Sequence, residues 1–120
     1  MYWLYAASAL SGFTALLHIF GGGKSAAKPL LESSMNDEAK YTNYYCWHMV
    51  TIIIISLSVC FLLAARNVEF RELAILSVAL CFAFALWSCF LIYIKKQKPF
   101  VLPQWVLFFL IAVVGTVGLL

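Results

Sequence analysis

Charged residues are scarce in this chain, which has eight Lys and Arg and five Asp and Glu among its 120 residues. They make up 11% of the sequence, against about 25% in an average soluble domain. Hydrophobic residues make up 65%, and the mean hydropathy is +0.97. A water-facing surface could not hide so much apolar side chain in a chain of this length. The composition therefore predicts a single domain that lies in a lipid bilayer.

The long apolar segments contain no Asp, Glu, Lys or Arg. Ion pumps, proton relays and voltage sensors need such groups at membrane depth, so this absence argues against those classes. It also argues against a small multidrug exporter, which would carry an acidic residue within the membrane. The net charge of +3 is too small and too dispersed to indicate a nucleic-acid partner.

The sequence also has no Cys-x-x-Cys pair, which argues against a membrane thiol-disulfide oxidoreductase. Three of the four cysteines lie inside apolar segments, where free Cys is usually a small buried side chain. The four are Cys46, Cys60, Cys81 and Cys89.

Four apolar segments are long enough to cross the hydrocarbon core as helices, which takes about 20 residues each. They comprise residues 2–20, 46–65, 73–94 and 102–120. Their apolar runs are continuous rather than alternating, which favours helices over barrel strands. The first lacks the basic start of a signal peptide, so we expect it to be retained. The predicted fold class is an all-α membrane protein, an antiparallel bundle of four transmembrane helices.

The connection 21–45 is the only long one, and we expect it to be a loop. The run Gly21-Gly22-Gly23 is predicted to stop the first helix, and Pro29 to prevent its early resumption. The stretch Ser34 to Asp37 fits a capping box, so the second helix is expected to begin near Met35, outside the lipid.

The basic residues predict the orientation. Loops 21–45 and 95–101 carry six Lys between them, whereas residues 66–72 carry two Arg. The positive-inside rule then places the two Lys-rich loops in the cytoplasm and both termini outside. Three aromatic side chains are expected to anchor the second helix at the cytoplasmic interface: Tyr41, Tyr45 and Trp47.

Two histidines are expected at the same depth. His18 lies two residues before the end of the first segment, and His48 lies two residues after the start of the second. Small or polar residues at helical spacing define one face on each helix. These faces comprise Ser8, Ser11, Thr14 and His18 on the first helix, and Lys40, Tyr44, His48 and Thr51 on the second. If the two faces meet, with Trp47 at the interface, both imidazoles lie in one pocket.

Three interpretations of this pocket stay open. In the first, each histidine binds a backbone carbonyl, a hydroxyl or a lipid headgroup. In the second, the pocket binds a small molecule or a lipid headgroup through His18, His48, Thr14, Tyr44, Thr51, Gln104 and Trp105. In the third, His18 and His48 hold haem or a transition metal. A copper-like site that adds Cys46 and Met49 is disfavoured, because Cys46 and His48 point about 200° apart on a helix.

Small residues also recur at helical spacing in the last two apolar segments, which predicts packing seams between helices. They are Ala74, Ser77, Cys81, Ala85 and Ser88 in the third segment, and Ala112, Gly115 and Gly118 in the fourth.

Several short motifs resemble a group of small bacterial four-helix inner-membrane proteins of uncharacterised function. They are Leu17-His18 with the following glycines, Pro29-Leu30-Leu31, Trp47-His48-x-x-Thr51 and Leu102-Pro103-Gln104-Trp105. The resemblance implies a bacterial inner-membrane protein and no particular activity. In size and number of spans the chain is also similar to the DoxX-like membrane proteins.

The leading hypothesis is a non-enzymatic accessory or oligomer-forming membrane subunit with a small polar pocket at the cytoplasmic face. Its partners would be the lipid bilayer and either further copies of itself or a larger membrane complex. The alternatives are a haem- or metal-binding redox protein and a small-solute carrier or pore that forms as an oligomer.

Overall fold

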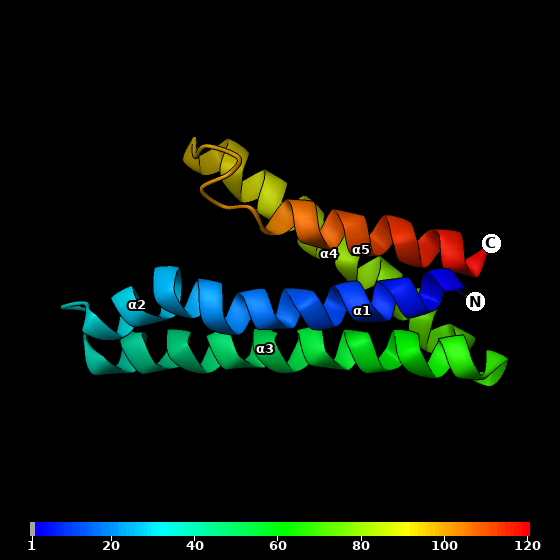
Figure 1. Ribbon diagram of the computed structural model, residues 1–120. Coiled ribbons are helices and arrows are strands. Elements are labelled where there is room, and N and C mark those ends of the chain that lie inside the picture. Colours follow the sequence, from blue (N-terminus) through cyan, green and yellow to red (C-terminus); the bar gives the residue numbers. More distant parts are fainter. Residues whose placement is uncertain (1) are drawn as a thin grey trace.

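A computed structural model of the protein describes residues 2–120, which form helices joined by short turns (Figure 1). The prediction of an all-helical protein is confirmed, because this part of the chain contains no β-strand. The elements are α1 (Tyr2–Leu16), the π-helix η1 (Leu17–Ala27), α2 (Lys28–Glu32), α3 (Asp37–Arg66), the 3-10 helix η2 (Val68–Phe70), α4 (Arg71–Lys95) and α5 (Gln104–Leu119).

The long helices form a closed ring of contacts, in which α1 packs on α3 and α5, and α4 packs on the same two helices. α1 and α3 lie side by side and run in opposite directions (Figure 1). The N- and C-terminal ends of the described chain lie at the same end of the molecule. The connection between α2 and α3 lies at the other end.

Three helical stretches are long and apolar enough to cross a membrane: Tyr2–Glu32, Asp37–Arg66 and Val68–Lys95. The fourth predicted span is shorter in the structure. α5 has 16 residues, or about 24 Å at 1.5 Å per residue, against a hydrocarbon core of about 30 Å. Its length alone therefore does not make α5 a membrane span.

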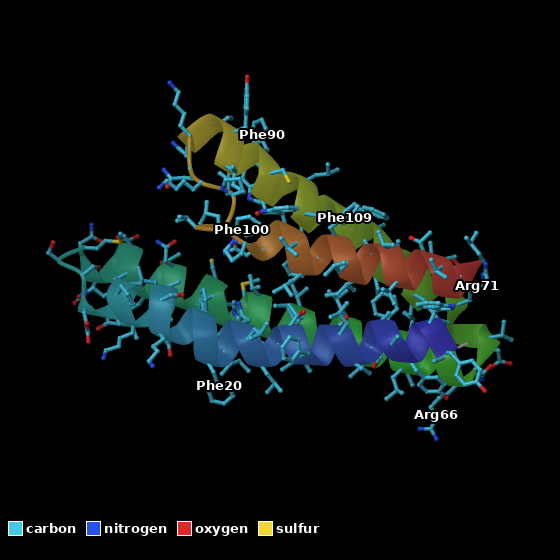
Figure 2. The ribbon with its side chains drawn as sticks, turned by 45° about the horizontal axis from the view of Figure 1, so that its top comes forward. Phe20, Arg66, Arg71, Phe90, Phe100 and Phe109 are labelled. Atoms are coloured by element: carbon cyan, nitrogen blue, oxygen red, sulfur yellow. The ribbon has the colours of Figure 1, made fainter. Side chains whose placement is uncertain are left out.

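Large apolar side chains cover the outside of the molecule, and small ones fill much of its inside. Phe20 is 72% exposed and Leu86 is 70% exposed, and Figure 2 shows the Phe20 ring projecting away from the neighbouring helices. The fully buried positions include Ala7, Ala74 and Ala112. In water such an apolar surface would drive association, whereas helices in lipid pack through small residues and present large ones outward.

Two serines join α1 to α3 by reciprocal hydrogen bonds. The Ser8 hydroxyl donates to the Ser58 carbonyl oxygen at 2.8 Å, and the Ser58 hydroxyl donates to the Ser8 carbonyl oxygen at 2.8 Å. The predicted stripe on the first helix is otherwise buried as expected, with Ser11 and Thr14 bonded to the carbonyl oxygens four residues earlier. The backbones can approach because no large side chain lies between them.

The predicted seams on the last two helices are also buried, except that Gly118 is half-buried. The buried residues of α4 are the five expected ones, Ala74, Ser77, Cys81, Ala85 and Ser88. On α5, a Cβ atom at Gly115 would lie 2.8 Å from Val78 Cγ2, and one at Gly118 would lie 2.8 Å from Leu4 Cδ2. Both glycines therefore allow contacts that any larger residue would disturb.

The prediction that the glycine run stops the first helix is wrong. The helical chain continues through Gly21, Gly22 and Gly23 as η1 and then as α2 to Glu32. A glycine stops a helix by adopting a left-handed conformation, and no glycine among residues 2–120 has a positive φ. Pro29 lies where η1 passes into α2, and the helical stretch continues through it to Glu32.

The connection 21–45 is consequently a helical hairpin rather than a loop. Only residues 33–36 separate α2 from α3. The N-cap of α3 is Asn36 rather than Ser34, and its side-chain oxygen accepts a hydrogen bond from the Ala39 N–H at 2.9 Å. The third residue of the helix is Ala39, which has no side-chain acceptor, so the predicted capping box is replaced by this single cap. The expected start near Met35 is close to the observed one at Asp37.

At the opposite end, α4 and α5 are joined by an arginine. The Arg71 guanidinium donates to the Leu119 carbonyl oxygen at 2.6 Å, and Figure 2 shows Arg71 beside the end of α5. A cation at the C-terminal end of a helix satisfies a free carbonyl and complements the helix dipole.

The serine pair predicts measurable coupling between α1 and α3. Ser8→Ala and Ser58→Ala should each lower the free energy of unfolding by about 1 kcal/mol, because each removes one hydrogen bond between the two helices. The double variant should lose less than the sum, with a coupling of about 0.6 kcal/mol or more. Unfolding in mixed micelles, followed by circular dichroism, measures this cycle.

Ser56→Ala is the matched control, because Ser56 is exposed and its hydroxyl bonds only to the Ile52 carbonyl oxygen within the same helix. Strictly additive effects of Ser8→Ala and Ser58→Ala would show that the reciprocal bonds do not hold the two helices together.

Candidate functional site

Trp47 is the centre of the polar junction between the first helical stretch and α3. Its indole ring stacks on the imidazole of His18, with the ring centroids 4.0 Å apart and the planes inclined by 17°. Trp47 is half-buried, so it lies between the helices. Tyr41 and Tyr45, the other two residues expected at the interface, are 56% and 66% exposed.

Two side chains converge on one backbone oxygen at this junction. The Trp47 carbonyl oxygen lies 3.1 Å from His18 Nε2 and accepts a hydrogen bond from the Thr51 hydroxyl at 3.3 Å. Because a carbonyl oxygen only accepts, Nε2 of His18 carries a proton. The expected proximity of His18 and Thr51 is thus observed, and Thr14 is buried on the same helical stretch as His18.

The glycine run makes room for the indole. A Cβ atom at Gly22 would lie 2.6 Å from Cη2 of Trp47, whereas nothing lies within 4 Å of a Cβ atom at Gly21 or Gly23. Glycine has a weak preference for the α-helix, so this stretch can adopt the wider π-helical turn. In that turn His18 and Gly22 present one surface, and the ring of Trp47 covers it.

His48 lies outside this junction. Its side chain is exposed, and its ring meets that of Tyr44 edge to face, with centroids 4.7 Å apart. Consecutive residues of a helix point about 100° apart, so turning Trp47 inward turns His48 away. The two imidazoles are near enough to interact electrostatically, but no hydrogen bond or ring contact joins them within residues 2–120.

The two remaining candidate residues do not join the histidines either. Gln104 lines a separate cavity of about 260 Å³ between α3, α4 and α5. The indole N–H of Trp105 donates to the Pro99 carbonyl oxygen at 3.0 Å, which closes the turn before α5. The start of α5 therefore belongs to another site.

The donor set does not fit a haem between the two histidines. Such a site needs one free nitrogen from each imidazole directed at a common iron. His18 uses Nε2 for the Trp47 carbonyl, and the indole covers one face of its ring. Within residues 2–120 there is also no group of three or more His, Cys, Asp or Glu side chains placed to hold a metal ion. We derive no redox chemistry from these residues.

Sequence reasoning missed Gly22 and the inward position of Trp47. The only signal for both is the glycine run itself, because a stretch without side chains is a place where a large ring from elsewhere can pack. Sequence reasoning also missed the cavity at Gln104, whose walls come from three separate helices.

Comparisons with models of protein families, with curated proteins and with solved structures gave no match to this chain.

The contact at Gly22 predicts a position-specific effect. Gly22→Ala should force the rigid indole off His18 and lower the free energy of unfolding by about 1–3 kcal/mol. In a variant that keeps Trp47 as its single tryptophan, the same change should also shift the emission maximum of Trp47. Fluorescence and chemical unfolding in detergent measure the two effects.

Gly21→Ala is the matched control, because it adds the same methyl group one residue away, into open space. It should be neutral or stabilising by up to about 1 kcal/mol. Equal effects at the two positions would contradict the packing described for Trp47.

Proposed function

We propose that this protein is an integral membrane protein of four antiparallel transmembrane helices that acts through contacts with other membrane proteins, as a non-enzymatic accessory or oligomer-forming subunit. In this proposal it lies in the cytoplasmic membrane of a bacterium, the setting that its short motifs imply. Residues 33–36 and 95–101 face the cytoplasm, and both termini lie outside.

The observation that carries the proposal is the distribution of charge along the helices. All charged residues lie in three short segments, 24–40, 66–72 and 95–98. These segments are at the helix ends, so the apolar lengths between them are free of charge. Such a pattern suits a bundle whose middle lies in hydrocarbon. α5 is short, and the apolar residues Phe100, Val101 and Leu102 lengthen its hydrophobic stretch.

The buried polar groups support a role without catalysis. Among residues 2–120, six polar side chains are buried: Ser8, Ser11, Thr14, Thr51, Ser77 and Ser88. In five of them the hydroxyl donates a hydrogen bond to a backbone carbonyl oxygen. None of the six is an acid, a base or a thiol, so these groups serve packing between helices rather than proton transfer.

The helical hairpin supports a role in contacts with partners. α3 has 30 residues, or about 45 Å, which exceeds the hydrocarbon core by about 15 Å. The excess lies at the end formed by α2 and the start of α3, which extends beyond the start of α5 (Figure 1). This extension carries the exposed rings of Tyr41 and Tyr45, and Tyr is a residue type that is enriched in protein interfaces.

A photo-crosslinking experiment tests this proposal. A photoreactive amino acid at Met35, which is 44% exposed at the tip of the hairpin, should give a discrete adduct with a second membrane protein or a second copy of this chain. The same amino acid at Val68, which is 77% exposed at the opposite end, should give none.

The protein should also stay in the membrane fraction after alkaline carbonate extraction. If neither position gives a discrete adduct, the accessory role is wrong. If alkaline extraction releases the protein, the membrane-spanning arrangement is wrong as well.

A further inference from the structure

The cavity between α3, α4 and α5 is apolar apart from two side chains. Its volume is about 260 Å³, and the aromatic rings of Phe84, Trp87 and Phe108 form part of its walls. Its polar lining residues are Ser88 and Gln104, and neither is charged. Trp87 is also 59% exposed, so this wall continues to the outer surface of the protein. The volume is just below the range of about 300–1,000 Å³ for small-molecule sites, which suits part of a larger ligand.

Ser88 differs from every other buried hydroxyl in the described chain. It is 92% buried, from an exposed fraction of 8%, and its Oγ has no hydrogen-bond partner among residues 2–120. The matching residue Ser77, on the same face of α4, donates to the Leu73 carbonyl oxygen at 2.7 Å. A buried hydroxyl is destabilising when unpaired and is usually satisfied. Ser88 therefore has an unpaired hydroxyl donor in the wall of the cavity.

The wall of the cavity leads to a group of lysines. Ser88, Leu91 and Lys95 follow one another on α4 at spacings of three and four residues, so they share one helix face. Ser88 and Leu91 line the cavity, and Lys95 begins the segment that also holds Lys96 and Lys98. Basic residues at the end of a membrane helix attract anionic lipid headgroups.

We propose that this cavity binds one acyl chain of an anionic phospholipid, with the ester carbonyl accepting a hydrogen bond from Ser88 and the phosphate lying at the lysines 95, 96 and 98. This inference rests on the proposed membrane location. The aromatic walls and the uncharged lining exclude the headgroup from the cavity, and the lysines favour a negative charge at its end. A neutral lipid would fill the cavity equally well but would leave the three lysines without a partner.

Defined lipids and the full-length purified protein test the proposal. Delipidated protein is mixed with dioleoyl phosphatidylglycerol or dioleoyl phosphatidylcholine, which share their acyl chains and differ in headgroup charge. Native mass spectrometry counts bound lipids, and thermal unfolding measures the stabilisation. We expect phosphatidylglycerol to bind about tenfold more tightly, and replacing lysines 95, 96 and 98 with Gln to remove that preference.

Two serine variants separate binding from folding. Ser88→Ala should leave the unfolding temperature of the lipid-free protein unchanged or raise it, because it removes an unpaired hydroxyl. It should also reduce the increase in unfolding temperature that phosphatidylglycerol causes. Ser77→Ala should lower the unfolding temperature and leave the lipid-induced rise unchanged, because it breaks a bond that the lipid does not use. Ser88→Leu fills the cavity and should reduce binding of both lipids about tenfold.

Equal binding of the two lipids by the unchanged protein overturns the proposal, as does a Ser88→Ala variant with the full lipid-induced rise. Release of the protein by alkaline carbonate would instead show that the membrane location itself is wrong. A protein that resists extraction and binds both lipids equally would keep the proposed function and lose only the lipid site.

Discussion

Small side chains lie between neighbouring long helices and let their backbones approach closely. A ring of four helices with large side chains outside needs small side chains inside, since there is no other way to bring the backbones together. Ser8 and Ser58 can form their reciprocal hydrogen bonds because both side chains are small, which lets α1 and α3 approach closely at these two residues. On α5, Gly115 and Gly118 admit Val78, Phe61 and Leu4 in the same way.

Local patterns predicted the helices and their packing seams well. The seam of α4 runs from Ala74 to Ser88 at a regular helical spacing, and periodicity alone identifies such a face because it needs no knowledge of the partner. The apolar segments were likewise recognisable from composition. The sequence did not predict which helix faces contact each other, because these contacts depend on residues far apart in the chain.

The glycine run shows why part of the prediction failed. A helix-stopping glycine and a glycine that accepts a neighbour's ring look identical in sequence, and only Trp47, 25 residues later, distinguishes them. The left-handed residue that ends a helix here is Lys96, with φ of 51°, which no glycine rule would identify. Trp47 and His48 are neighbours on α3, so their side chains point about 100° apart. Trp47 therefore faces the junction between the helices, and His48 faces outward.

The residues of the predicted histidine pocket lie in two separate sites, because the sequence did not predict the direction of each side chain around its helix axis. The level of a residue along the helices follows from its position in the sequence, so His18, His48 and Gln104 could be expected at one level. Direction around each helix axis follows from packing, and at that level the helices enclose two separate spaces. One is the polar contact of His18 with Trp47, and the other is the apolar cavity beside Ser88.

The uninterrupted first helix has a mechanical consequence. A loop after the glycines would absorb any movement of residues 33–36, because flexible chain transmits little force. Residues 33–36 instead connect two long helical stretches, Tyr2–Glu32 and Asp37–Arg66. Because the hydrogen bonds of Ser8 and Ser58 join these two stretches, a displacement of residues 33–36 would move both of them together.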